Sequence, residues 1–201
     1  FDLVISDISS RQLYAKGQYS VPSDTACYPA KLMHGHIENL LDKGVDTIFY
    51  PCMSYNFNEE KGDNNFNFPV AASYPELLAS NVEKLKNIRY LYPYLNLAER
   101  KTFPKKVWEA LHEQYPDITL KEVKRASDEA YEAYQAQRRD IRVKGAQMLT
   151  QARARGVKTI ILSGRPYHVD PEINHGINQL ITSLGLAVIS EDCVSDLATP
   201  V

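Results

Sequence analysis

A long helical run in the second half of the chain limits what the whole sequence can fold into. Thr119 and Glu122 have the spacing of a capping box, and the Ala-rich, charged stretch after them keeps a helical pattern until Gly156. A helix from Thr119 to Arg155 would be roughly 50 Å long at about 1.5 Å per residue. Because this is too long for a crossover inside a small sheet, the run predicts a helix that bridges or braces two halves.

Strand and helix signals alternate before this run. The predicted helices have serine or proline start signals or end at a glycine, and the predicted strands are short apolar runs. In chain order we expect a buried strand at 1–6, a helix at 9–17, a helix from about Tyr28 to Lys43, a strand at 45–51, a loop at 53–68, a short buried strand at 69–73 and a helix at 74–85 with Pro75 in its first turn. This alternation predicts a parallel sheet.

A further helix is expected at 102–115, just before the long run. A second α/β pattern begins after the run, with strands expected at 158–164 and 186–192 and a helix at 171–185 between them, so this part holds one βαβ turn only. We therefore expect an α/β protein made of flavodoxin/Rossmann-like parallel sheet units with a long helical connection, the second unit being partial. The predicted division is a first α/β unit at 1–98, the helical connection at 99–156 and the start of a second α/β unit at 157–201.

Charge and cysteine content exclude several classes of protein. The 23 basic and 25 acidic residues are spread along the chain, which leaves no basic stripe for nucleic acid. The longest apolar runs, such as 159–162, are far too short to span a membrane. Three widely spaced cysteines and no signal-peptide pattern favour free or metal-bound thiols in the cytoplasm. A first residue of Phe1 rather than Met indicates a domain from a longer polypeptide.

The predicted helix from Tyr28 to Lys43 carries two different faces. The apolar set, which we expect in the core, consists of Met33, Ile37, Leu40 and Leu41. The other set, aligned on a second face, consists of Cys27, Lys31, His34 and Glu38. His36 lies on the flank of the apolar set, where a hydrogen-bonded structural histidine is favoured over a ligand.

The three cysteines obey one placement rule. Cys27 lies at the start of a predicted helix, where N–H groups favour a thiolate, and Cys52 and Cys193 each follow a predicted strand. In a parallel sheet these positions share one edge, so the three sulfurs could converge if the two units face each other. Without a CxxC pair, three thiolates fit an iron–sulfur cluster with one open iron better than a structural zinc site. Three unrelated buried cysteines are an equally weighted alternative.

The stretch "SGRPYHVDPEINHG" at 163–176 is a second candidate. A strand leads through Gly164 into a loop with Arg165, Tyr167 and His168, and Asp170 is a candidate N-cap for a helix starting near Pro171. Arg165 and the helix N–H groups could bind a phosphate or carboxylate. Alternatively, Arg165 and Tyr167 bind backbone or pair with Asp170. The chain has neither GxxxxGK[ST] nor GxGxxG, so nucleotide binding by those loops is not supported.

Two segments, "SDTACYPAKLMHGHIENLLDKGVDTIFYPCM" and "LSGRPYHVDPEINHGINQLITSLGLAVISEDCV", resemble the uncharacterised domain (DUF2229) of large CoA-substrate-specific enzyme activases. The resemblance extends to 2-hydroxyacyl-CoA dehydratases and double-cubane proteins, whose paired flavodoxin-like domains hold an oxygen-sensitive iron–sulfur cluster through three cysteines. It implies that Cys27, Cys52 and Cys193 hold a 4Fe-4S or double-cubane cluster, which a purified fragment can lack. The chain departs from the family pattern at Phe68, where a cysteine often precedes the proline, and at Cys193, where serine is frequent.

Two functions follow from this resemblance. In the first, the cluster accepts a low-potential electron from an ATP-driven activator module, expected in the same polypeptide, and serves an acyl-CoA substrate. The residues expected around the cluster or ligand are Lys31, His34, Arg165, Tyr167 and His168. In the second, the chain is a non-catalytic module that docks the ATPase and dehydratase portions of a large polypeptide. A thiol redox enzyme is disfavoured because there is no CxxC.

Overall fold

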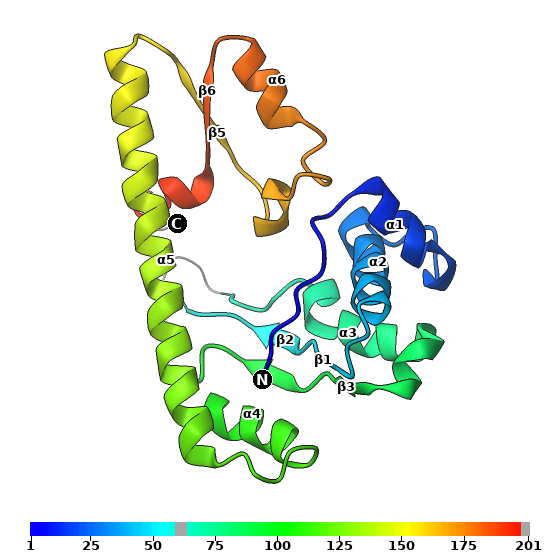
Figure 1. The fold of residues 1–201 in the computed structure, drawn as a ribbon. Coiled ribbons are helices and arrows are strands. Elements are labelled where there is room, and N and C mark those ends of the chain that lie inside the picture. The colour runs from blue at the N-terminus through cyan, green and yellow to red at the C-terminus, as the bar shows by residue number, and fades with distance from the viewer. Residues whose placement is uncertain (59–63, 198–201) are drawn as a thin grey trace. The chain divides into compact units, whose positions relative to one another are not determined.

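The chain folds into two units, which we describe separately. The computed structural model describes residues 1–58 and 64–197, and the units are Phe1–Asp128 and Glu129–Pro200 (Figure 1). The predicted loop at 53–68 and the predicted second unit at 157–201 thus extend in part outside the described residues. The α/β class with a long helix is confirmed.

The first unit begins with two helices that cross very closely. Helix α1 (Arg11–Gly17) is capped by Ser10, whose side chain accepts a hydrogen bond from Leu13 N, and the 3₁₀ turn η1 (Gln18–Ser20) leads toward α2 (Tyr28–Asp42). A Cβ atom added to Gly35 would lie 2.0 Å from the Leu13 carbonyl oxygen. Both helices match the prediction, and α2 is followed by Gly44, whose φ of 75° suits the left-handed end of a helix.

The first ten residues are not a strand. No ladder is formed there, and Leu3 and Ile5 are 85% and 71% exposed, so the predicted buried strand at 1–6 is wrong. The segment is held instead by side chains of α2: Asp7 N donates to Asn39 Oδ1 at 2.9 Å, and Lys43 Nζ donates to Ile5 O at 2.7 Å. The apolar letters of this segment suggested a strand, but no neighbouring strand pairs with it.

Two pairs of parallel strands follow α2. Strand β1 (Thr47–Phe49) pairs with β3 (Arg89–Leu91), and β2 (Cys52–Tyr55) pairs with β4 (Tyr94–Asn96). The sequence predicted β1 but neither β3 nor β4. It placed Cys52 at the carboxyl end of a strand and residues 53–55 in a loop, whereas Cys52 begins β2. Beyond β2, Tyr55 and Phe66 form an isolated antiparallel bridge.

Helix α3 (Pro69–Asn81) corrects the prediction of a strand at 69–73. Pro69 occupies its first turn, where the missing N–H costs no hydrogen bond, so Pro75 lies inside the helix rather than in its first turn. The 3₁₀ helix η2 (Glu83–Asn87) follows. The buried core cluster of this unit comprises Ala30, Ile37, Ile48, Tyr74, Leu78, Val82 and Leu85. Met33, Leu40 and Leu41 pack against it, which confirms the apolar face of α2.

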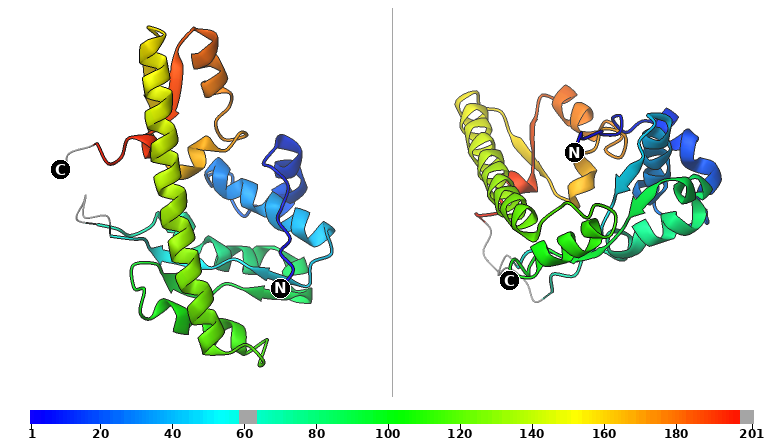
Figure 2. Two further views of the ribbon diagram at one scale, coloured as in Figure 1. Left: turned by 60° about the vertical axis from the view of Figure 1, so that its left-hand side comes forward. Right: turned by 60° about the horizontal axis from the view of Figure 1, so that its bottom comes forward.

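The helical part of the chain matches the sequence signals closely. Helix α4 (Phe103–His112) is tied to the next loop by Trp108 Nε1, which donates to Ile118 O at 3.0 Å. Helix α5 (Leu120–Ala154) has 35 residues and is continuous in every view (Figure 2). Glu122 Oε2 accepts from Thr119 N at 2.9 Å, and Glu122 N donates to Thr119 Oγ1 at 3.3 Å, so the predicted capping box is present.

The second unit contains the last part of α5 and one βαβ turn. Strand β5 (Thr159–Leu162) pairs in parallel with β6 (Ala187–Ser190), and between them lie η3 (Pro166–Val169) and helix α6 (Ile177–Ser183). The predicted helix at 171–185 therefore starts later than expected. Asp170 Oδ1 accepts hydrogen bonds from Glu172 N and Ile173 N in a local turn. Gly176, just before α6, has a φ of 76°, which is not a helical conformation.

Candidate functional site

Cys27 is the N-cap residue of α2. Its side chain is exposed and makes no capping hydrogen bond, while its carbonyl accepts the first helical bond from Lys31 N at 3.1 Å. The Lys31 ammonium donates to Asp24 O at 2.7 Å, which closes the loop before the helix. Lys31, predicted to surround a ligand, thus has a partner in the backbone of its own loop.

His34 is completely buried and both of its ring nitrogens are occupied. Ser20 Oγ donates to Gly17 O at 3.0 Å, so His34 Nδ1 donates to Ser20 Oγ at 2.7 Å. Nε2 is then unprotonated and accepts from the Tyr74 hydroxyl at 2.9 Å. Burial lowers the pKa of His34 to about 4, which keeps the imidazole neutral.

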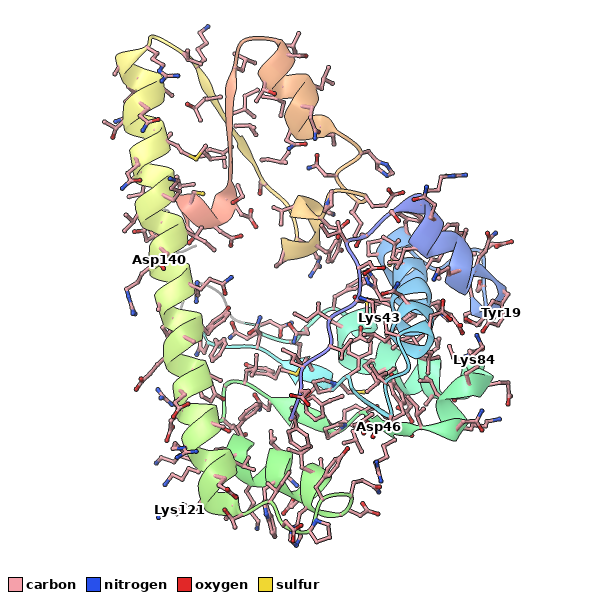
Figure 3. The ribbon with its side chains drawn as sticks, viewed as in Figure 1. Tyr19, Lys43, Asp46, Lys84, Lys121 and Asp140 are labelled. Atoms are coloured by element: carbon pink, nitrogen blue, oxygen red, sulfur yellow. The ribbon has the colours of Figure 1, made fainter. Side chains whose placement is uncertain are left out.

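Glu38 is also buried, at 3% exposure, and it accepts two hydrogen bonds. The hydroxyl of Tyr19 donates to Oε1, and Lys84 Nζ donates to Oε2 at 2.6 Å; Figure 3 shows Tyr19 and Lys84 near each other beside α2. The hydrogen bond to Glu38 raises the pKa of Tyr19 and that of Lys84. The predicted polar face of α2 is therefore a buried face from His34 onward.

His36 holds the N-terminal segment against α2. Its Nδ1 lies 2.8 Å from Ser6 Oγ and its Nε2 lies 3.1 Å from Ser9 Oγ. One turn further along, Asn39 Nδ2 donates to Asp7 Oδ2 at 2.8 Å. The predicted structural role of His36 is confirmed by these two hydrogen bonds.

Cys52 is a fully buried thiol at the start of β2. Burial raises the pKa of this thiol, an effect that a hydrogen bond from the Glu76 backbone partly opposes. The Tyr94 hydroxyl donates its proton to Glu76 Oε2 at 2.5 Å, and this bond raises the pKa of Tyr94 to about 12. At neutral pH Cys52 is therefore a protonated thiol.

Four tyrosines of the first unit have raised pKa values. Burial raises the pKa of Tyr74 and that of Tyr50 to about 12. Burial also raises the pKa of Tyr90, whereas the hydrogen bond to Glu76 is the main cause for Tyr94. We call these four residues, Tyr50, Tyr74, Tyr90 and Tyr94, the tyrosine cluster.

In the second unit, the loop after β5 closes on itself. Arg165 N donates to His168 Nδ1 at 3.0 Å, and His168 N donates to Arg165 O at 2.8 Å. A Cβ atom on Gly164 would lie 2.1 Å from His168 Nδ1, so a larger residue there would displace the His168 ring. Tyr167 packs edge-on against His168 with ring centroids 4.8 Å apart. The helix N terminus expected near Pro171 as an anion site does not form, because those residues make turns.

Cys193 lies in η4 (Glu191–Cys193), just after β6. Its Sγ is 3.6 Å from Ser190 Oγ, and its Cβ packs over Gly145 of α5, where an added methyl carbon would lie 2.4 Å away. Nearby, the Ser163 hydroxyl donates to Glu191 Oε2 at 2.5 Å. Cys193 thus belongs to the second unit.

The donor atoms of the described residues do not by themselves build a cluster site. Across residues 1–58 and 64–197, no group of three or more Cys, His, Asp or Glu side chains is placed to hold a metal ion. Cys27 and Cys52 are in the first unit, and Phe68 at the N-cap of α3 offers no ligand. A cluster held by Cys27, Cys52 and Cys193 stays a prediction.

A helix able to cross a bilayer is likewise not found in the described part of the chain, since its long helix α5 is too polar. Taken together, the parallel strand pairs, the long helix and the internally bonded motif of α2 define an α/β protein with a long helix.

Comparison with known families identifies this domain. The model of the CoA enzyme activase uncharacterised domain (DUF2229) matches residues 1–194, and the chain belongs to this family. The family resemblance predicted from the two motif segments is therefore confirmed. No curated protein and no solved structure matches the chain.

Proposed function

We propose that this chain is a non-catalytic docking domain of a CoA enzyme activase polypeptide, in which it positions an ATPase activator module and the acyl-CoA enzyme that the activator serves. One observation carries the proposal: the polar side chains of α2 are hydrogen-bonded to other residues of the same domain. His34 binds Ser20 and Tyr74, His36 binds Ser6 and Ser9, and Glu38 binds Tyr19 and Lys84.

A general acid or base must reach a substrate proton, directly or through one water molecule. His34 is 0% exposed with both nitrogens engaged, and Glu38 is 3% exposed between a hydroxyl and an ammonium. These groups hold η1, α3 and η2 against α2. Their arrangement supports a rigid structural unit rather than a reaction centre.

The competing proposal is an iron–sulfur domain that accepts a low-potential electron. It is supported by the family resemblance. It is opposed by the donor geometry, because among the described residues no group of three or more Cys, His, Asp or Glu side chains is placed to hold a metal ion. We derive no reaction step from it.

Anaerobic reconstitution with iron and sulfide distinguishes the two proposals. For the docking domain we expect colourless protein with background iron for the wild type and for the Cys52→Ser variant alike. Brown wild-type protein with stoichiometric iron and sulfide, bleached in Cys52→Ser and unchanged in a Lys121→Ala control, would overturn it. Docking itself is measured by titrating the ATPase module of a DUF2229 protein into this chain by calorimetry, where absence of heat at several temperatures contradicts the proposal.

A further inference from the structure

The second unit contains a cavity at the carboxyl edge of its strand pair. It has a volume of about 260 Å³ and lies among β5, β6, the end of η3 and helix α6. Leu162 and Ser190, which pair in register as the last residues of β5 and β6, both line it. In open parallel α/β sheets, the carboxyl ends of the strands are where ligands bind.

The lining of this cavity is apolar with several neutral polar groups. The apolar walls are formed by Leu162, Val169, Pro171, Val188 and Ile189. The polar groups are the amides of Asn174, Asn178 and Gln179 and the hydroxyl of Ser190. Of the described residues that line the cavity, none carries a charge, so a charged group entering it would lose hydration without an ionic partner.

Of the three side-chain amides, only that of Asn174 makes hydrogen bonds to described residues. Asn174 is 7% exposed; its Nδ2 donates to His168 O at 3.0 Å and its Oδ1 accepts from Asn178 N at 3.2 Å. By contrast, the side-chain amides of Asn178 and Gln179 make no hydrogen bond to any described residue. Each presents a donor and an acceptor side by side, next to an apolar wall.

We propose that this cavity binds an uncharged group that displays a hydrogen-bond donor beside an acceptor. Primary amides form paired hydrogen bonds with such groups, as they do with adenine. The volume is just below that of pockets for whole drug-sized ligands, so it accommodates one ring system or a short chain segment. A nucleobase and the amide chain of a pantetheine share this chemistry. The inference rests on the cavity alone and does not depend on the docking role.

Titration of ¹⁵N-labelled protein with adenosine, and separately with pantetheine, tests the proposal. Saturable shifts of the Asn178 and Gln179 side-chain amide signals with either probe support it, and the probe that acts identifies the source of the group. Shifts with neither probe, or shifts confined to residues outside the cavity, overturn it.

Two variants of exposed residues test the lining directly. Asn178→Leu and Gln179→Met remove an amide at nearly constant size, and each should weaken binding about fivefold to 150-fold, the effect of one bidentate pair of hydrogen bonds. Gln147→Met on α5 makes the same type of change away from the cavity and should leave binding unaltered. Equal affinity in all three variants contradicts the assignment of the amides.

Discussion

Acidification should weaken the first unit through His34. The folded chain holds this imidazole neutral, because Nδ1 donates to Ser20, Nε2 accepts from Tyr74 and burial lowers the pKa from 6.5 to about 4. The unfolded chain exposes the ring to water, where its pKa is near 6.5. Between these two values the unfolded state binds a proton that the folded state does not.

The expected loss in the free energy of unfolding follows from the difference between the folded and unfolded pKa values of His34. A difference of about 2.5 pKa units, at 1.36 kcal/mol per unit, gives on the order of 3 kcal/mol. The contribution of His34 to stability is complete above about pH 6.5, falls as the pH is lowered toward 4 and does not fall further below that pH. For a small domain this is a large part of the total free energy of unfolding.

Urea denaturation followed by circular dichroism measures the effect, at several pH values between 7.5 and 4. The matched variant is His34→Gln, whose amide does not titrate. We expect the wild type to lose about 3 kcal/mol more than the variant over this range, whatever the offset between them at pH 7.5. Parallel pH dependence of the two proteins, or an NMR titration of His34 with a pKa near 6.5, would refute the reasoning.

Two further predictions concern packing and thiol access. Gly35→Ala should lower the free energy of unfolding, measured in urea, by about 1–3 kcal/mol, because the new methyl group meets the backbone of Leu13. The control Gly44→Asn, at a position with open space around it, should lower it less. Equal losses in the two variants would contradict the close crossing of α1 and α2. Iodoacetamide should label Cys27 in the native protein and Cys52 only after unfolding, as followed by mass spectrometry, and rapid native labelling of Cys52 would contradict its burial.

Elements with local signals were predictable from the sequence. The capping box at Thr119 and the glycine at Gly156 mark the long helix within a few residues of the structural bounds, and Ser10 and Gly44 do the same for α1 and α2. Elements marked only by a short apolar run were not predictable, because a run of five residues fits a strand or a helical turn equally well. At 69–73 the deciding signal was Pro69 at a helix start.

Within the candidate site, the sequence predicted the structural role of His36, which its hydrogen bonds to Ser6 and Ser9 confirm. The burial of His34 and Glu38 was missed, because a helical wheel sorts residues by type and cannot show that Tyr74 or Lys84, distant in sequence, will pair with them. The tyrosine cluster was missed for the same reason.

The attachment of the first ten residues has a consequence for how this chain tolerates damage. Ser6, Asp7 and Ser9 bind side chains of α2 through their own side chains and through the Asp7 backbone N–H, and no backbone ladder joins them to a sheet. If a protease trimmed this segment, it would uncover an imidazole and an amide, which water can solvate, instead of a bare strand edge that recruits other chains. Removal of these ten residues should therefore yield a less stable molecule that stays in solution.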